Sequence, residues 1–335
     1  AALNNRLQGT LEYFNRTTRD MVGPPSPLPF TLGTGQPSEN NATLVSKGWE
    51  AELKWRDYVG KVNYGLRFIL SDDIQTVTQY YNPTGSLSTW YAGRRMGEIW
   101  GYTTAGIAKT NDEMNEHLQH NRPSWGDNWQ AGDIMYKDLN DDNTVNGGAN
   151  TLSDHGDLRR LGYNAPRFKV GFNADLTWQG LDFSFFLQGV GRRDWFDNSP
   201  YSVGATSHGQ WQSVGFKEHW DFFRPEGDPN GANLNARYPR PLFEKGSKNM
   251  QTQSRYVVNA AYLRIKNIQL GYTLPASLTK KIGVSRLRVY TSADNLVTFT
   301  KLPKIFDPEA TGGDWGPGKI YPLQRVISCG LNVNI

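Results

Sequence analysis

Oxygen-bearing side chains at alternate positions between residues 138 and 146 are the feature of this sequence that points most directly to chemistry. Ligands at every second position converge on one hard cation in Ca²⁺-binding loops, and Mg²⁺ favours the same oxygen donors. The sequence therefore suggests a Ca²⁺ or Mg²⁺ site here, although nothing in it requires a cofactor. The residues concerned are Asp138, Asn140, Asp142, Thr144 and Asn146.

This metal-binding signature is incomplete. Asn143 replaces the usual turn glycine, and Ala149 stands where a bidentate acid is expected, although Asp154 or Asp157 could supply that carboxylate. The alternative is an Asx-rich surface turn, held by hydrogen bonds from backbone N–H groups to side-chain oxygens. The residues alone leave both interpretations open.

Aromatic residues are frequent in the segments without strand character. Exposed rings beside polar groups suit sugar rings, which have apolar faces and hydroxyl rims, so these residues are predicted to contact substrate. The alternative is that the rings pack the loops against one another or against a lid protein. The set comprises Trp90, Tyr91, Trp100, Trp125, Trp129, Trp211 and Trp220.

Acidic residues raise the question of catalysis. Glu218 and His219 suggest acid/base chemistry, and Glu50 with Glu52 suggests a glycosidase pair, but each is explained more simply as a solvated surface residue. The sequence has no nucleophile elbow, metal-binding His pair or phosphate loop. The chain is therefore predicted not to be an enzyme.

The segments between these loops alternate apolar and polar residues, as strands with two different faces do. Near Lys266 and Asn267 the alternation changes phase, which predicts a β-bulge. The expected strands cover about residues 7–13, 49–56, 62–70, 168–178, 181–187, 261–274, 287–293 and 325–335.

These strands indicate an all-β antiparallel fold of roughly eight strands, joined by short turns at one end and long loops at the other. The long loops are expected at about residues 74–164, 196–258 and 301–322. The final strand places Leu331 and Val333 on one apolar face up to the chain terminus, which suits a barrel wall between lipid and a wet lumen. Trp55 and Trp178 lie beside short turns, where an interfacial aromatic girdle is expected.

Composition agrees with a membrane barrel and excludes other classes. Of the 335 residues only 37% are hydrophobic, and no apolar run reaches the ~18 residues of a transmembrane helix. A net charge of +4 is too small to indicate nucleic-acid binding. The single cysteine, Cys329, excludes a disulfide framework within the chain.

Several motifs resemble the SusC/RagA family of TonB-dependent outer-membrane transporters, in the order in which that family has them. GDIMYKDLNDD is similar to the family segment GDIxYKDLNxDG, ARYPR to its NAxYPR loop, and GEIWGYTTAG to its IGxxxGYxxxGI element. The two strands AYLRIKNIQLGYTLP and LRVYTSADNLVTFT, with FDPE after them, resemble its C-terminal signature. The segments are residues 132–142, 236–240, 97–106, 261–275, 287–300 and 306–309.

The resemblance implies a plugged barrel of about 22 strands in the outer membrane of Gram-negative bacteria of the Bacteroidetes type. Residues 1–335 are expected to be the C-terminal part of that barrel, with the plug and the N-terminal strands absent from this chain. The implied function is TonB-dependent import of glycans or peptides, in which this chain forms barrel wall and extracellular loops. The implied partners are a SusD-like surface lipoprotein, TonB, outer-membrane lipid and the rest of the transporter.

A second function class stays open from the sequence alone. A soluble carbohydrate-binding β-sandwich would also bury one face of each hairpin, without any transport activity. The discriminating residues are the apolar ones at alternate positions, such as Phe172, Leu331 and Val333. They face lipid in a barrel, but they lie in a packed interior in a sandwich.

Overall fold

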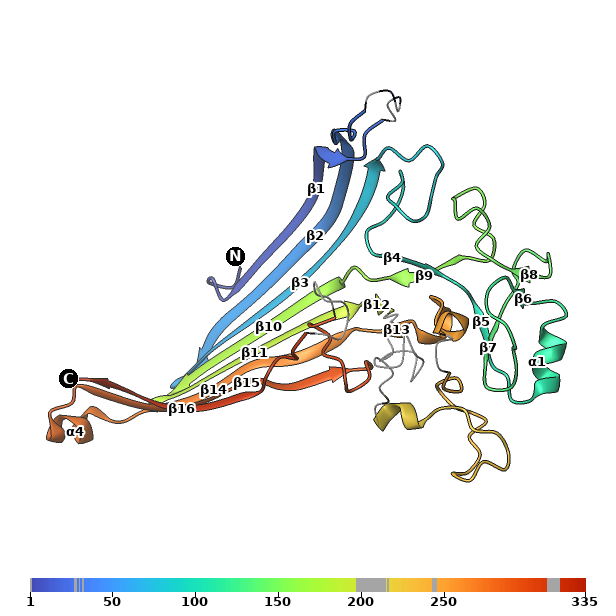
Figure 1. The fold of residues 1–335 in the computed structure, drawn as a ribbon. Coiled ribbons are helices and arrows are strands. Elements are labelled where there is room, and N and C mark those ends of the chain that lie inside the picture. Colours follow the sequence, from blue (N-terminus) through green and yellow to red (C-terminus); the bar gives the residue numbers. More distant parts are fainter. Residues whose placement is uncertain are drawn as a thin grey trace.

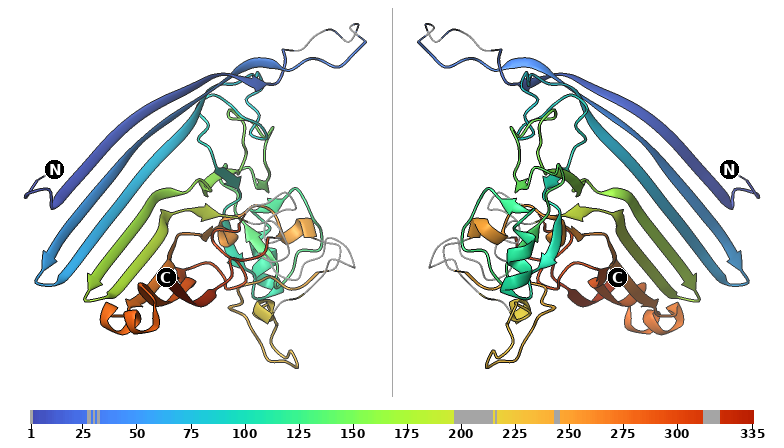
Figure 2. Two further views of the ribbon diagram at one scale, coloured as in Figure 1. Left: turned by 90° about the vertical axis from the view of Figure 1, so that its left-hand side faces the viewer. Right: turned by 90° about the vertical axis from the view of Figure 1, so that its right-hand side faces the viewer.

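Long β-strands and a separate body of loops make up this protein in the computed structural model (Figure 1). The structure describes residues 2–26, 29, 31, 33–196, 215, 217–242, 246–311 and 320–335. The strands form one curved sheet, and the loops gather at one end of it, as the two side views also show (Figure 2). No helix among the described residues is both long enough and apolar enough to cross a membrane.

Eight strands form the main sheet, and all neighbours in it are antiparallel, as predicted. Their spatial order follows the chain, so each strand pairs with the next long strand in sequence. The strands are β1 (Leu7–Gly23), β2 (Glu39–Val59), β3 (Val62–Gln79), β10 (Arg167–Trp178), β11 (Leu181–Arg192), β14 (Tyr262–Thr273), β15 (Arg286–Thr300) and β16 (Val326–Asn334).

The register of the sheet sorts side chains by polarity. Residues that pair across strands point to the same face, and one such row is apolar from β2 to β15. Its members are Leu53, Phe68, Phe172, Leu187, Ile265 and Val297. A neighbouring row on the opposite face is polar or small and comprises Arg56, Gly65, Asp175, Ser184, Gln269, Ser292 and Ser328.

The apolar face of the sheet is not a protein interior. Leu53 is 50% exposed, Phe68 42% and Leu331 64%, and Val333 is also exposed. None of the three buried hydrophobic clusters in the described chain contains a residue of this face. Phe172, Leu331 and Val333 therefore do not lie in a packed core, and the sandwich alternative is wrong.

The turns and the bulge lie where the sequence predicts them. Gly60 and Gly180 adopt positive φ angles of 60° and 92° in the tight turns after β2 and β10. The pairing of β14 with β15 shifts between Ile265 and Asn267, which confirms the predicted bulge. Because of this shift, Ile265 and Ile268 lie on one apolar face despite their odd spacing.

Strands β2 and β3 are longer than the sequence suggests. β2 begins at Glu39, well before Trp49, and β3 continues to Gln79, past the residue near 74 where a loop is expected. In these extensions the alternation of apolar and polar residues is weak, so periodicity does not mark them as strands.

The loop body has its own short elements and its own core. Its largest cluster of buried residues includes Tyr136, Tyr238 and Tyr256. The short strands are β4 (Glu98–Gly101), β5 (Thr104–Ile107), β6 (Arg122–Pro123), β7 (Ile134–Tyr136), β8 (Thr144–Val145), β9 (Arg159–Tyr163), β12 (Asp194–Trp195) and β13 (Val258–Asn259). The helices are α1 (Asn111–His117), α3 (Gly246–Asn249) and, at the short-turn end of the sheet, α4 (Ala276–Thr279), with 3₁₀ turns at Lys217–Trp220, Ser254–Tyr256 and Lys280–Ile282.

Candidate functional site

Two of the predicted aromatic residues, Tyr91 and Trp100, pack around the buried carboxylate of Glu98. The Tyr91 hydroxyl donates a hydrogen bond to this carboxylate, and the Trp100 indole N–H donates another at 3.1 Å. The backbone N–H of Arg95 donates a third at 3.1 Å, and Arg160 forms an ion pair with Glu98 at 3.3 Å. Tyr91 is only 6% exposed, so its ring is not available to a ligand.

The electrostatics of this cluster favour a charged carboxylate. Burial opposes ionisation of Glu98, but the hydrogen bonds and Arg160 outweigh burial and hold the pKa of this carboxyl below its usual value. Burial, with the hydrogen bond to Glu98, raises the pKa of Tyr91 to about 12. Glu98 therefore fixes loop structure as an anion, and this cluster is a structural unit.

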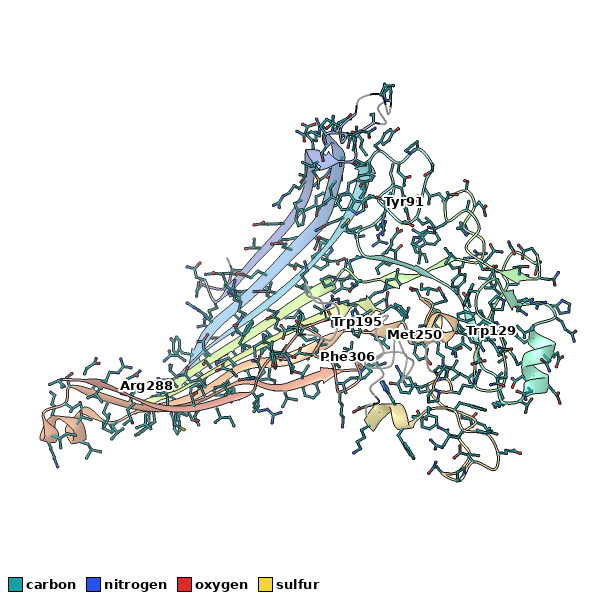
Figure 3. The ribbon with its side chains drawn as sticks, in the orientation of Figure 1. Tyr91, Trp129, Trp195, Met250, Arg288 and Phe306 are labelled. Atoms are coloured by element: carbon teal, nitrogen blue, oxygen red, sulfur yellow. The ribbon has the colours of Figure 1, made fainter. Side chains whose placement is uncertain are left out.

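Trp125 and Trp129 both pack against the buried ring of Tyr136. The ring centroids of Trp125 and Tyr136 are 5.1 Å apart, those of Trp129 and Tyr136 are 6.1 Å apart, and both contacts are edge to face. The indole N–H of Trp125 donates a 3.3 Å hydrogen bond to the Lys248 carbonyl. Figure 3 shows Trp129 and Met250 in this part of the loop body. Both indoles thus have packing partners that account for their position.

Beneath these rings, Asp133 joins two loops that are far apart in sequence. Its carboxylate is fully buried and accepts hydrogen bonds from Arg240 at 2.9 Å and from Asn249 at 3.0 Å. Lys248 forms an ion pair with it at 2.8 Å and is itself 2% exposed. Burial lowers the pKa of the Lys248 ammonium, and Asp133 opposes that shift. The sequence motifs include Asp133 and Arg240, but neither motif suggests that the two residues meet.

The remaining predicted aromatics differ in accessibility. Trp90 is half-buried against Tyr80, with ring centroids 5.6 Å apart. Trp220 is 59% exposed, and the Arg224 guanidinium lies 5.2 Å from its ring centroid. Trp211 lies outside the described residues. Trp220 is therefore the described member of the set with the ring most available to a ligand, and substrate contact by the set stays a prediction.

The proposed metal loop is organised by hydrogen bonds to its own backbone. Asp138 accepts from the backbone N–H groups of Asn140 at 3.0 Å and Asn143 at 2.6 Å, and Asp142 accepts from that of Thr144 at 2.7 Å. The carboxylate of Asp157, which could have completed a metal site, accepts from Leu139 and from Asn146.

These contacts match the Asx-turn alternative. Within the described ranges no three His, Cys, Asp or Glu side chains converge as a metal site requires. Cation binding by Asp138, Asn140, Asp142, Thr144 and Asn146 stays a prediction. A rise in melting temperature with added Ca²⁺ that is lost in Asp138→Asn would support it.

The polar face of the sheet carries ion pairs that the sequence does not reveal. The Arg288 guanidinium on β15 reaches across Gly271 of β14 to Asp182 of β11, with Nε 2.9 Å from a carboxylate oxygen. A Cβ on residue 271 would collide with the Arg288 guanidinium where it now lies, so glycine leaves room for the pair in this arrangement. The sequence signal for this ion pair would have been opposite charges on strands two apart in the sheet. That signal can be recognised only when the pairing register of the strands is known.

A second ionic cluster joins the sheet to the loop between β15 and β16. Arg264 on β14 is 3% exposed and lies 2.6 Å from Asp307. Glu309 accepts from Arg264 and lies 3.0 Å from Lys266. Backbone hydrogen bonds and Arg264 hold the pKa of Asp307 below its usual value against the effect of burial. The FDPE segment thus anchors its loop to the wall.

Comparison with known proteins finds similarity to TonB-dependent receptors. No protein-family model matches it. It is 25% identical to TonB-dependent receptor P3 of Formosa agariphila over 99% of the chain and 33% of the receptor. It is also 25% identical to TonB-dependent receptor P26 of the same organism, over 98% of the chain and 33% of that receptor. The chain thus spans about a third of the length of the curated relatives it matches.

Solved structures agree on the fold. The chain superposes on the RagAB peptide transporter with a TM-score of 0.69, at 23% identity, over 98% of the chain and 34% of the other. The RagAB peptide importer in its open-open state gives a TM-score of 0.71 over 99% of the chain and 33% of the other. The eight-stranded sheet therefore has the fold of part of these solved structures.

Proposed function

We propose that this chain, a homologue of TonB-dependent receptors of the SusC/RagA type, forms wall and outer loops of an importer of glycans or peptides in the outer membrane. The observation that carries the proposal is the apolar row through Leu53, Phe68 and Phe172, which belongs to none of the buried cores that the described residues form. Hydrocarbon is the environment that stabilises such a face, because exposing apolar side chains to water is unfavourable.

Transport, and not catalysis, is the activity that these features support. The polar opposite face, with ion pairs such as Asp182 with Arg288, suits a wet lumen. The loop body is ordered around Glu98 and Asp133, and in this proposal it is the part that meets substrate and a lid. In this proposal a SusD-like surface lipoprotein covers the loops, and TonB supplies energy through the rest of the transporter.

Fractionation and uptake test the proposal. The whole protein is expected in the outer-membrane fraction, to require detergent for extraction and to co-purify with a SusD-like lipoprotein. Cells that lack its gene are expected to lose uptake of a labelled oligosaccharide or peptide and to regain it with the gene restored. Recovery of the whole protein in the soluble fraction without detergent would refute it.

A further inference from the structure

Two neighbouring cavities lie beside the segment that leads from β15 toward β16. The larger, about 530 Å³, is lined by Leu302, Ile305 and Arg325 among others. The smaller, about 500 Å³, is lined by Arg237, Val258 and Lys301 among others. Both are lined by Lys304, so the two cavities meet at this side chain.

The two cavities carry an excess of positive charge. Their linings contain five cationic side chains and two carboxylates, those of Asp307 and Glu218. Asp307 is already engaged, because it binds the Arg264 guanidinium and accepts the backbone N–H groups of Glu309 and Leu323. Among the described residues the linings therefore hold four further cations and one further carboxylate, that of Glu218.

These four cations are exposed, and none forms an ion pair with a carboxylate in the described part of the chain. They are Arg237, Lys301, Lys304 and Arg325. Like charges placed together in a cleft with low-dielectric walls concentrate the field and attract anions. An anionic ligand would relieve this repulsion.

A buried cluster fixes the position of the segment that carries Lys301 and Lys304. Leu302 is 5% exposed and Phe306 9%, and both pack with Trp195, which is 1% exposed. The rings of Phe306 and Trp195 have centroids 4.8 Å apart in an edge-to-face contact, and Figure 3 shows them close to each other. The two lysines therefore project from a fixed backbone, which reduces the entropy lost when a ligand binds.

The shape and lining favour one kind of anion. Two adjoining cavities suit an extended oligomer, and Leu302, Ile305 and Val258 offer apolar contacts between the charges. The aromatic rings in the linings, Tyr238 at 3% exposed and Phe306, are buried, so sugar rings would find no stacking surface here.

We propose that these two cavities bind an acidic oligopeptide through its carboxylates, an inference that rests on the proposed function as an importer. Lys301, Lys304, Arg237 and Arg325 receive the carboxylates. The apolar residues between them receive aliphatic side chains of the peptide.

Binding to the purified full-length transporter in detergent tests this assignment. The probes are two fluorescein-labelled peptides, one of alternating glutamate and leucine, the other with glutamine in place of glutamate. The glutamate peptide is expected to bind about tenfold or more tightly than its glutamine counterpart, because each exposed ion pair contributes a modest amount and three or four act together. This preference is expected to shrink as salt rises.

A triple variant and a matched control locate the effect. Lys301→Gln with Lys304→Gln and Arg325→Gln is expected to abolish the preference for the glutamate peptide. The control, Lys109→Gln with Lys280→Gln and Lys281→Gln, removes the same charge at exposed positions away from the cavities and is expected to keep it. Loss of the preference in both variants would overturn the site, since total charge would then explain it.

Two further outcomes would overturn the proposal. Equal affinity for both peptides would show that charge is not recognised. Displacement of the glutamate peptide by an oligogalacturonate at least as effectively as by unlabelled peptide would assign the cavities to acidic glycans. Binding in detergent needs neither TonB nor an energised membrane, so either result would leave the import proposal to be judged by the uptake assay.

Discussion

The sheet and the loop body of this chain place their apolar side chains in opposite environments. On the sheet, Phe68 and Leu53 are exposed side by side, and no buried cluster in the described part of the chain includes the face they share. In the loop body, Tyr136 and Ile134 are almost completely buried within one cluster. The apolar side chains of the sheet thus face outward, whereas those of the loop body are buried against one another.

This difference indicates which forces hold each region. In the proposed membrane setting the sheet depends on its hydrogen-bond ladder and on lipid, because none of the buried clusters found among the described residues includes its apolar rows. The loop body depends on close packing and on buried charge pairs, as a water-soluble domain does. Substitutions should therefore have different consequences in the two regions.

The largest effect is expected from Asp133→Ala in the loop body. This change leaves Lys248 and Arg240 without their buried carboxylate, and breaking such a pair costs about 3–5 kcal/mol. Limited proteolysis of the whole protein should show the loops cut much faster. The sheet should keep its resistance to unfolding in SDS. Asp142→Asn, at an exposed position, serves as the control, and equal damage in both variants would contradict this view of the loop core.

A somewhat smaller effect is expected on the sheet. Phe172→Arg places a charge on the apolar face, where its neighbours are Phe68 and Leu187, and should cost about 2–4 kcal/mol. Asn173→Arg, one residue along on the polar face, should cost little. Refolding into detergent or vesicles at increasing urea measures both. Equal losses would mean that the two faces are not distinct.

Acid should loosen the loops before the sheet. The pKa of Glu98 is held below its usual value, so its contribution to stability is present above the usual pKa and is lost as the pH falls through the lowered one. Protease sensitivity of the loops should therefore rise as the pH falls below about 4.5, the usual pKa of a glutamate. Glu98→Gln should weaken the loops at neutral pH by about 1–3 kcal/mol and flatten this dependence. An unchanged pH profile in the variant would exclude Glu98 as the titrating group.

The smallest effect on stability is expected from Trp220→Ala. This ring is exposed, so its loss should change stability by no more than about 0.5 kcal/mol. Trp125→Ala, which empties a packed position, should cost several times more. If Trp220 contacts substrate, its variant should weaken ligand binding at unchanged melting temperature. A melting temperature that falls as far as in Trp125→Ala would reverse the assignment.

The same contrast explains what sequence could predict. Alternation along each strand is a local property, so Phe172 and Leu331 identify the sheet, its two faces and the bulge near Asn267 without any structure. The part of β2 before Trp49 and the part of β3 after about residue 74 lack this alternation, so the sequence does not predict them as strand.

The loop core could not be predicted, because it depends on contacts between distant segments. Trp125 meets the backbone of Lys248, and Asp133 meets Arg240, both more than 100 positions apart in sequence. The aromatic content of the loops is the same whether the rings bind a ligand or pack against one another, so composition does not distinguish these roles. Only the fold separates Tyr91, which is buried, from Trp220, which is exposed. The basic cavities beside Lys304 could not be predicted from the sequence, because Arg237 and Arg325, which line them, come from separate segments.

The length of β2 carries a consequence for how far the protein rises above the bilayer. Its 21 residues extend roughly 70 Å, whereas a tilted strand needs only about 9–11 residues to cross the hydrocarbon. The alternation of apolar and polar residues is lost on the N-terminal side of Trp49, so Trp49 marks the outer boundary of the hydrocarbon. A spin label at Leu53 should report an apolar lipid environment, and one at Thr43 should report contact with water. Labels along this strand would therefore measure how deeply it lies in the bilayer.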